Sequence, residues 1–218
     1  MSKKIKAVIF DMDGLMFDTE SLFSKVQTEI AKKRGKVFNL EIQNEMMGRK
    51  PFDAIKVMMD ELGINEDPKK IAQERDEAYL NLLKTDSKNM PGLFEFLDLL
   101  DKHEIKKAIA SGSHHEWINI LLEKFNIRDR FDVIISGQDV KIAKPAPEIY
   151  NKTVSALNLK SVECLVLEDA VNGIKAAKAA GCLAVAIPNQ FTKHQNFSEA
   201  DYVIGSLSDT ALKNILEI

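Results

Sequence analysis

Cysteines and long apolar runs are scarce in this sequence. The 218 residues include two cysteines, Cys164 and Cys182, and each lies among apolar neighbours in or beside a segment expected to be a strand. We interpret them as reduced thiols in the core of a cytoplasmic protein, rather than as a disulfide or a metal-binding pair. No apolar run approaches the roughly 20 residues that a membrane helix requires, so we expect no membrane partner.

The chain also lacks an excess of positive charge. It has 30 Lys and Arg residues against 33 Asp and Glu residues, which gives a formal net charge of −3. No global basic field is therefore present to attract nucleic acid. The basic start, MSKKIK, leads into an apolar run shorter than the core of a signal peptide, and we interpret this run as the first strand. With 45% hydrophobic residues and no repeats, the composition is that of an ordinary globular protein of one or two domains.

Hydrophobic periodicity divides the chain into two kinds of segment. After a strand at residues 7–10, helical spacing predominates over residues 19–85, where no convincing strand occurs. From about residue 90 onward, short apolar strands alternate with helices, which is typical of a parallel sheet with helices on both faces. We therefore predict an α/β fold with a doubly wound, Rossmann-like core at residues 1–15 and 90–218. A small all-α cap domain is expected as an insertion at residues 16–89.

Polar residues occupy the ends of the expected strands in the core. In an open parallel sheet, the loops at the carboxyl ends of the strands hold the ligand. These positions carry four acids, one hydroxyl and one lysine: Asp11, Asp13, Ser111, Lys144, Glu168 and Asp169. Carboxylates clustered with one ammonium suit a hard divalent cation together with an anionic substrate. A cation would also explain why two acids, Asp11 and Asp13, directly follow a buried strand.

With these motifs in order, the sequence resembles the haloacid dehalogenase-like hydrolase superfamily along essentially its whole length. The motifs are D-x-D-G at residues 11–14, the strand-end Ser111, the run KPAPEIY that begins at Lys144, and the acidic pair Glu168 and Asp169. A lone D-x-D-G is a weak signal, whereas all four motifs in this order are a specific one. The helical insertion is similar to the cap of the branch that contains β-phosphoglucomutase, phosphoglycolate phosphatase, sugar-phosphate phosphatases and pseudouridine-5′-phosphatase. The stretches FDMDGLMFDTE and MMGRKPFDAI are most similar to the last of these.

The resemblance implies a role for each residue of the core site. Asp11 is expected to attack phosphorus and form an aspartyl-phosphate, while Asp13 acts as general acid and base. Mg²⁺ is the expected cofactor, held by the Asp11 carboxylate, the Asp13 backbone carbonyl and the Asp169 carboxylate. Glu168 is either a further ligand or a group that orients a bound water. Two side chains and three backbone N–H groups are expected to hold the phosphoryl oxygens: the side chains of Ser111 and Lys144, and the N–H groups of Met12, Asp13 and Gly112.

The helical insertion is expected to act as a lid that closes on two hinges, at about residues 15–18 and 85–91. Its GRK turn, residues 48–50, makes Arg49 and Lys50 candidate contacts to the substrate. The alternative interpretation of this turn is a solvated basic loop, and the charges alone favour neither.

Single residues separate the activities within this superfamily. A dehalogenase generally lacks the second acid and a phosphonatase has a small residue there, so Asp13 favours phosphate chemistry. A β-phosphoglucomutase has a histidine where this chain has Phe23, and an arginine near the place of Pro51. We therefore predict a monomeric, Mg²⁺-dependent phosphomonoester hydrolase that acts on a small phosphorylated metabolite, either a sugar phosphate or a nucleotide-like compound. The alternatives are a phosphosugar mutase of the β-phosphoglucomutase type and a non-catalytic protein that binds phosphorylated ligands.

Overall fold

The chain folds into two compact units in the computed structural model, which describes residues 4–46, 49 and 51–218. The first unit comprises residues 1–18 and 88–218, and the second comprises residues 19–87. The second unit is therefore an insertion that follows the first strand of the first unit.

The first unit is an α/β structure. Its strands are β1 (Ala7–Phe10), β2 (Lys106–Ser111), β3 (Val133–Ser136), β4 (Cys164–Glu168), β5 (Leu183–Ala186) and β6 (Tyr202–Val203). Its helices are α5 (Leu93–Lys102), α6 (His115–Lys124), α7 (Glu148–Ala156), α8 (Val171–Ala179) and α9 (Ala211–Leu216). In the part of the chain that the structure describes, the strands form one parallel sheet in the order β3-β2-β1-β4-β5-β6. The predicted doubly wound fold is confirmed.

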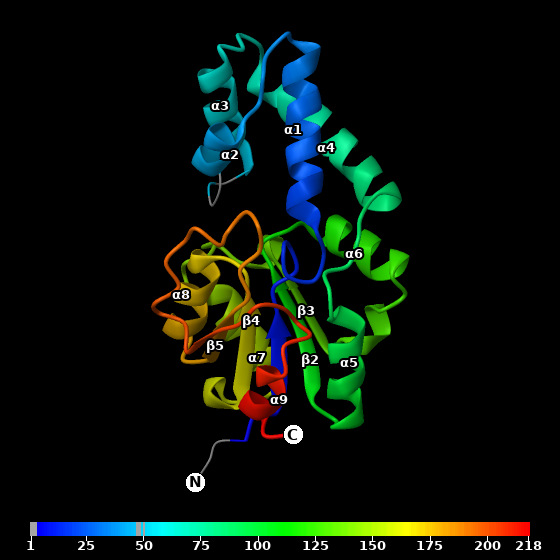
Figure 1. Ribbon diagram of the computed structural model, residues 1–218, viewed down its shortest axis with the longest axis vertical. Coiled ribbons are helices and arrows are strands. Elements are labelled where there is room, and N and C mark those ends of the chain that lie inside the picture. The colour runs from blue at the N-terminus through cyan, green and yellow to red at the C-terminus, as the bar shows by residue number, and fades with distance from the viewer. Residues whose placement is uncertain (1–3, 47–48, 50) are drawn as a thin grey trace. The chain divides into compact units, whose positions relative to one another are not determined.

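The sheet is buried on both faces because its central strands are apolar at successive positions. The four residues of β1, Ala7, Val8, Ile9 and Phe10, are all inaccessible to solvent. Alternate side chains of a strand point to opposite faces. Ile9 packs in a cluster with side chains of α7 and α8, whereas the ring of Phe10 lies edge-on to Phe96 of α5, with the ring centroids 5.9 Å apart. Accordingly, α7 and α8 cover one face of the sheet, and α5 and α6 the other (Figure 1).

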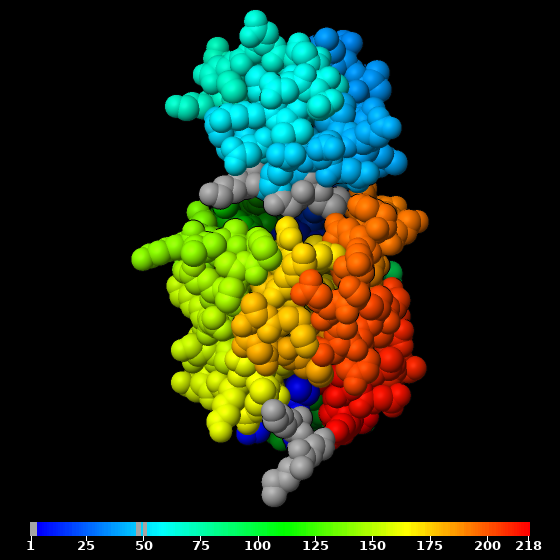
Figure 2. Space-filling view, turned by 90° about the vertical axis from the view of Figure 1, so that its left-hand side faces the viewer, coloured from blue at the N-terminus to red at the C-terminus, as the bar shows by residue number. Residues whose placement is uncertain are grey.

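Later segments of the chain cover the first strand completely, since its four residues are inaccessible to solvent. On the side of the first unit that faces the viewer in Figure 2, only small areas of the first segment (dark blue) reach the surface among the segments coloured yellow-green to red. The buried N–H and C=O groups of β1 nevertheless have hydrogen-bond partners, because β1 pairs with β2 on one side and with β4 on the other. This central position fixes the place of the residues that follow β1.

The elements of regular structure in the described part of the second unit are all helices. Its helices are α1 (Thr19–Lys33), α2 (Leu40–Met46), α3 (Pro51–Leu62) and α4 (Pro68–Thr85). Asp67 caps α4, since its carboxylate accepts a hydrogen bond from the Lys69 N–H at 2.9 Å. Arg34, just after α1, donates to Glu66 at 2.6 Å and to Glu74 of α4 at 2.8 Å, which helps to hold α1 against α4. Among the described residues, no helix is long and apolar enough to cross a membrane.

The boundary between the units differs from the one that the sequence indicated. We placed residues 16–18 and 88–89 in the helical insertion, but they group with the first unit. The physical reason is hydrogen bonding between the two connecting segments, because the N–H of Met90 donates to the Met16 carbonyl at 2.8 Å. These segments are therefore attached to each other and to the core before the chain enters α1.

Candidate active site

The acids of the first and fourth strands lie together because β1 and β4 are neighbours in the sheet. Asp11 follows Phe10, and its N–H donates to the Leu167 carbonyl at 3.0 Å, which continues the hydrogen bonding between the strands. Glu168 is the last residue of β4, and Asp169 follows it. The strand order reverses at this pair, since β2 and β3 lie beyond β1 while β5 and β6 lie beyond β4. A ligand site is typical of this position in a doubly wound sheet.

Lys144 connects the two strand ends through its ammonium group. Its Nζ donates to Asp11 Oδ1 at 2.6 Å, to Glu168 Oε1 at 2.7 Å and to the Ala110 carbonyl at 2.9 Å. The hydroxyl of Tyr150 on α7 donates to the same Glu168 oxygen at 2.6 Å. The exposed fraction of the side chain is 14% for Lys144, 10% for Asp11 and 2% for Glu168. Asp11, Lys144, Tyr150 and Glu168 thus form a buried ionic network.

Burial shifts the pKa values of the ionic network. Removal from water raises the pKa of Asp11 to about 8, against the attraction of Lys144. Burial alone would lower the pKa of Lys144, but the carboxylates beside it raise that pKa well above its usual value. The pKa of Tyr150 is raised by burial and then by the charge of Glu168. The network therefore keeps its ammonium charged and its phenol neutral, and in the absence of a cation burial favours the protonated form of Asp11.

Asp13 lies in a separate set of hydrogen bonds. Its Oδ2 accepts from the hydroxyl of Ser111 at 3.0 Å and from that of Ser113 at 2.7 Å. Its Oδ1 is buried and has no hydrogen-bond partner among the described residues. Ser113 is held in turn by the end of β3, since its carbonyl accepts from the Ser136 hydroxyl at 2.6 Å. A positioned carboxyl oxygen two residues from Asp11 can exchange a proton with a ligand bound there.

Glu168 is confined by the helix that follows it. Gly173 lies in the first turn of α8, and a Cβ atom built on it would lie only 1.7 Å from Glu168 Oε1. The other carboxylate oxygen, Oε2, accepts a hydrogen bond from the Ala170 N–H at 3.3 Å. Both oxygens of Glu168 are therefore engaged by donors of the protein, and the absence of a side chain at Gly173 makes this possible.

The acids have the composition of a divalent-cation site. Ligand atoms of Asp11, Glu168 and Asp169 all lie within 4.8 Å of one another, and all three residues are buried. Three ionised carboxylates and the single ammonium of Lys144 together carry a formal charge of −2. A divalent cation cancels this charge, and carboxylate oxygens are ligands that Mg²⁺ prefers. The residues present therefore fit Mg²⁺.

The remaining predicted residues lie in both units. Met12 is buried directly after Asp11, and Gly112 is exposed directly after β2, so both lie at the carboxyl edge of the sheet. In the second unit, Arg49 is exposed and its Nε donates to the Glu45 carbonyl at 2.5 Å, near the end of α2. Lys50 lies outside the described residues.

Three residues of the site were not predicted from the sequence. Ser113 lies two residues after a predicted site residue, and Tyr150 lies within KPAPEIY, yet neither was assigned a role. Asn189 follows β5, and its Nδ2 donates to Asp169 Oδ2 at 2.7 Å. The rule that ligands bind at strand ends could have found Asn189, because it lies just beyond a fifth strand end.

A family model connects this geometry to known proteins. The model described as haloacid dehalogenase-like hydrolase matches residues 8–187, which contain the ionic network, Asp13 and Asp169. The chain belongs to the haloacid dehalogenase-like hydrolase family. The resemblance drawn from the four sequence motifs is confirmed.

Several known proteins are similar to this one over most of the chain. The chain is 33% identical over 215 residues to (DL)-glycerol-3-phosphatase 2 of Arabidopsis thaliana, which covers 94% of this chain and 88% of that protein. It is 32% identical over 181 residues to the phosphorylated carbohydrates phosphatase of Thermotoga maritima, with coverage of 81% and 82%. Its fold is similar to that of β-phosphoglucomutase from Clostridium difficile, with a TM-score of 0.79, 26% identity and coverage of 98% and 96%. Within this hydrolase family, the protein is an enzyme, a phosphatase.

Proposed function

We propose that this phosphatase is a Mg²⁺-dependent phosphomonoesterase that transfers a phosphoryl group first to Asp11 and then to water. The observation that carries the proposal is the buried contact of 2.6 Å between Asp11 Oδ1 and Lys144 Nζ, with Asp13 two residues further along the chain. A carboxylate that attacks phosphorus must approach another anion, and Lys144 provides positive charge at that point. Among the described hydrogen bonds, Asp13 shares none with the ionic network, and its carboxyl group can exchange a proton with the leaving group.

The reaction proceeds in two displacements. In the first, an Asp11 oxygen bonds to phosphorus while the bond from phosphorus to the ester oxygen breaks, and Asp13 protonates that oxygen so that an alcohol leaves. In the second, Asp13 takes a proton from water, the water oxygen bonds to phosphorus, and the Asp11 carboxylate leaves as inorganic phosphate forms. The hydroxyls of Ser111 and Ser113 hold the Asp13 carboxyl group in place before substrate binds. A hydroxyl has one proton, so Ser111 gives up its bond to Asp13 when it donates to a phosphoryl oxygen, while Ser113 keeps its own. Lys144 already donates to three protein oxygens, so it holds the phosphoryl oxygens through its positive charge.

Mg²⁺ fits the site through the carboxylates of Asp11 and Asp169 and the backbone carbonyl of Asp13. When bound, the cation supplies positive charge that favours ionised Asp11 and offsets the charge of the phosphate. Glu168 orients its neighbours rather than acting as a ligand in this proposal, because its two oxygens already accept hydrogen bonds from Lys144, Tyr150 and the Ala170 N–H.

The substrate class is inferred from the relatives. The similar proteins of Arabidopsis thaliana and Thermotoga maritima are named for glycerol 3-phosphate and for phosphorylated carbohydrates. We extend this class to the present chain as a small phosphorylated metabolite, either a sugar phosphate or a nucleotide-like monoester. Selection among such compounds is assigned to the helical second unit in its role as a cap, with Arg49 and Lys50 as candidate contacts.

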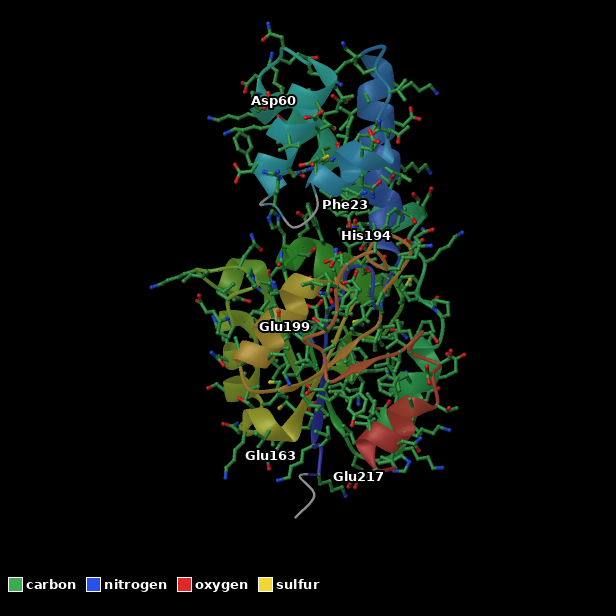
Figure 3. The ribbon with its side chains drawn as sticks, turned by 60° about the vertical axis from the view of Figure 1, so that its left-hand side comes forward. Phe23, Asp60, Glu163, His194, Glu199 and Glu217 are labelled. Atoms are coloured by element: carbon green, nitrogen blue, oxygen red, sulfur yellow. The ribbon has the colours of Figure 1, made fainter. Side chains whose placement is uncertain are left out.

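Phe23 favours hydrolysis over the mutase alternative. Phe23 lies on α1 (labelled in Figure 3), and its ring stacks on that of Tyr79 with the centroids 3.9 Å apart. A phenyl ring cannot exchange a proton, as the histidine expected at this position in a β-phosphoglucomutase can. The similarity to the mutase therefore concerns the fold and the core site, which both activities require.

Phosphate release from a panel of monoesters tests the proposal. The purified chain with MgCl₂ is expected to hydrolyse at least one of a panel of sugar phosphates, glycerol 3-phosphate, phosphoglycolate, nucleotides and pseudouridine 5′-phosphate, and EDTA should abolish the activity. Asp11→Asn should lower kcat by about 10⁴-fold or more, because the nucleophile is lost. The matched control, Asp129→Asn at an exposed position, should leave kcat unchanged. No phosphate release from any monoester would contradict the proposal, and interconversion of glucose 1- and 6-phosphates with added bisphosphate would favour the mutase.

A further inference from the structure

Asn189 connects three segments at the edge of the candidate active site. It lies on the loop after β5, five residues before His194, which Figure 3 labels on the same loop. Its Nδ2 donates to Asp169 Oδ2 at 2.7 Å, beyond the end of β4, and to the Gly14 carbonyl at 3.1 Å, beyond the end of β1. One side-chain amide thus bridges the exits of two central strands.

The orientation of the amide is fixed by the loop itself. The Oδ1 atom of Asn189 accepts from the N–H of Phe191 at 2.8 Å and from that of Thr192 at 3.2 Å. Backbone N–H groups can only donate, so the oxygen of the amide must face them and its NH₂ group must face Asp169 and Gly14. The Asn189 N–H in turn donates to the hydroxyl of the buried Thr192 at 3.0 Å. The side chain is therefore held as a donor directed toward the acid.

The three segments approach one another so closely that only glycine fits at residue 14. Gly14 has φ of +73°, and a Cβ atom built on it would lie 2.5 Å from Asn189 Nδ2 and 2.7 Å from Asp169 Oδ2. The N–H of Gly14 donates to the Phe17 carbonyl at 2.9 Å, which closes the turn that leads out of β1. The amide therefore holds the proposed metal ligand and this turn together.

We propose that Asn189 is a positioning residue of the metal site, an inference that rests on the proposed function because it requires Mg²⁺ at Asp169. A hydrogen bond to Oδ2 fixes the rotation of the Asp169 carboxylate and hence the direction of Oδ1. The donor is neutral, so it orients the acid without reducing the negative charge available to the cation. Groups that orient metal ligands in this way typically change metal affinity by about 10–100-fold when removed.

Calorimetric titration of the full chain with MgCl₂ tests this role without measuring activity. Two variants separate the effect of the bridge to Asp169 and Gly14 from the effect of the hydrogen bonds that order the loop. Asn189→Ala removes both, whereas Asn189→Ser keeps a hydroxyl oxygen that can accept from the N–H groups of Phe191 and Thr192 but is too short to reach Asp169. We expect both variants to raise the Kd for Mg²⁺ by about 10-fold or more. Asn196→Ala is the matched control. Among the described hydrogen bonds, the Asn196 side chain accepts only a comparable local one, from the Ser198 N–H at 3.0 Å. The Kd of this variant for Mg²⁺ should stay within about twofold of the wild-type value.

Hydrogen exchange adds a second readout at the turn. Exchange of the amides of residues 14–18 should be faster in Asn189→Ala and Asn189→Ser than in the wild type or in Asn196→Ala, since the Gly14 carbonyl loses its donor. Wild-type Mg²⁺ affinity in Asn189→Ser would overturn the inference, because the loop alone would then be sufficient. A wild-type chain that binds no Mg²⁺ would instead show that the proposed metal site is wrong, and the inference would fall with it.

Discussion

Replacement of Gly173 by alanine tests how firmly Glu168 is held. Within a helix, a change from glycine to alanine ordinarily raises the free energy of unfolding by roughly 0.5–1 kcal/mol, because glycine loses more backbone freedom on folding. We expect the opposite sign at Gly173. The new Cβ atom would lie 1.7 Å from Oε1 and 1.8 Å from Cδ of Glu168, whereas Cβ atoms essentially never approach other atoms within 3.0 Å. The buried carboxylate must therefore move.

The cost of this movement can be worked from the contacts of Glu168. Displacement breaks its hydrogen bonds with Lys144 Nζ at 2.7 Å and with the Tyr150 hydroxyl at 2.6 Å. A hydrogen bond to a charged group contributes about 1.5–3 kcal/mol, and overpacking of a core costs about 1–3 kcal/mol. If the carboxylate recovers one of the two bonds after it moves, the loss of the other together with overpacking, less the gain in helix propensity, lowers the free energy of unfolding in Gly173→Ala by about 2–5 kcal/mol. The kcat should fall as well, because Lys144 also binds Asp11.

Urea denaturation, with m-values compared, measures the change in stability. Gly205→Ala is the matched control, since a Cβ atom there meets nothing within 4 Å, and it should change the free energy of unfolding by less than about 0.5 kcal/mol. A double-mutant cycle isolates the cause: in a Glu168→Ala background, Gly173→Ala should be neutral or stabilising. A Gly173→Ala protein as stable as the wild type would show that Glu168 is not firmly held, and the same loss without the Glu168 carboxylate would show that another contact causes it.

Two further predictions concern Asp11 and Tyr150. The pKa of Asp11 is raised from 3.8 to about 8, so between about pH 4 and pH 8 the folded chain binds a proton that the unfolded chain has released. The free energy of unfolding of the metal-free chain should therefore fall as the pH rises through this range. Urea denaturation in EDTA should show a shallower fall for Asp11→Asn, and equal slopes would exclude this cause. Tyr150→Phe should lower the free energy of unfolding by about 1.5–3 kcal/mol, because it removes the buried hydrogen bond to the Glu168 carboxylate. The exposed control Tyr202→Phe should change it by less than about 0.5 kcal/mol. Equal effects of the two substitutions would show that the buried hydroxyl contributes nothing.

The fold was predictable because the hydrophobic pattern of the sequence matches the burial of its residues in the structure. The run CLVLE of β4 is apolar up to its last residue, and every one of its residues is buried, as expected for a central strand of a parallel sheet. The boundary of the insertion was less predictable. It depends on the hydrogen bond between Met90 and Met16, which are far apart in the sequence, and no local pattern encodes such a bond.

The candidate site was predictable to the extent that its residues lie at strand ends. Asp11 and Glu168 could be expected to meet, because the carboxyl ends of parallel strands share one edge of the sheet. Tyr150 reaches the site from a helix, and its role depends on how α7 packs on the sheet rather than on its place in the sequence. Gly173 acts through the space that it leaves for Glu168, which is visible only once the helix and the strand are both in place. Asn189 lies three residues beyond the end of β5, and no local pattern indicates that its amide bridges Asp169 and Gly14.

The buried charge of the site also explains how the proposed cofactor and the proposed nucleophile depend on each other. Without Mg²⁺, the Lys144 ammonium is the only positive charge of the described ionic network, and burial raises the pKa of Asp11 to about 8, which favours its protonated form. A protonated carboxyl group is a poor nucleophile, so Asp11 is inactive in that state. Ligation of Mg²⁺ requires the ionised carboxylate, and Asp11 must therefore release its proton when the cation binds. The metal-free enzyme would then retain only the charge of Lys144 beside the phosphate and would hold less of the carboxylate that attacks it, so removal of Mg²⁺ should abolish measurable activity.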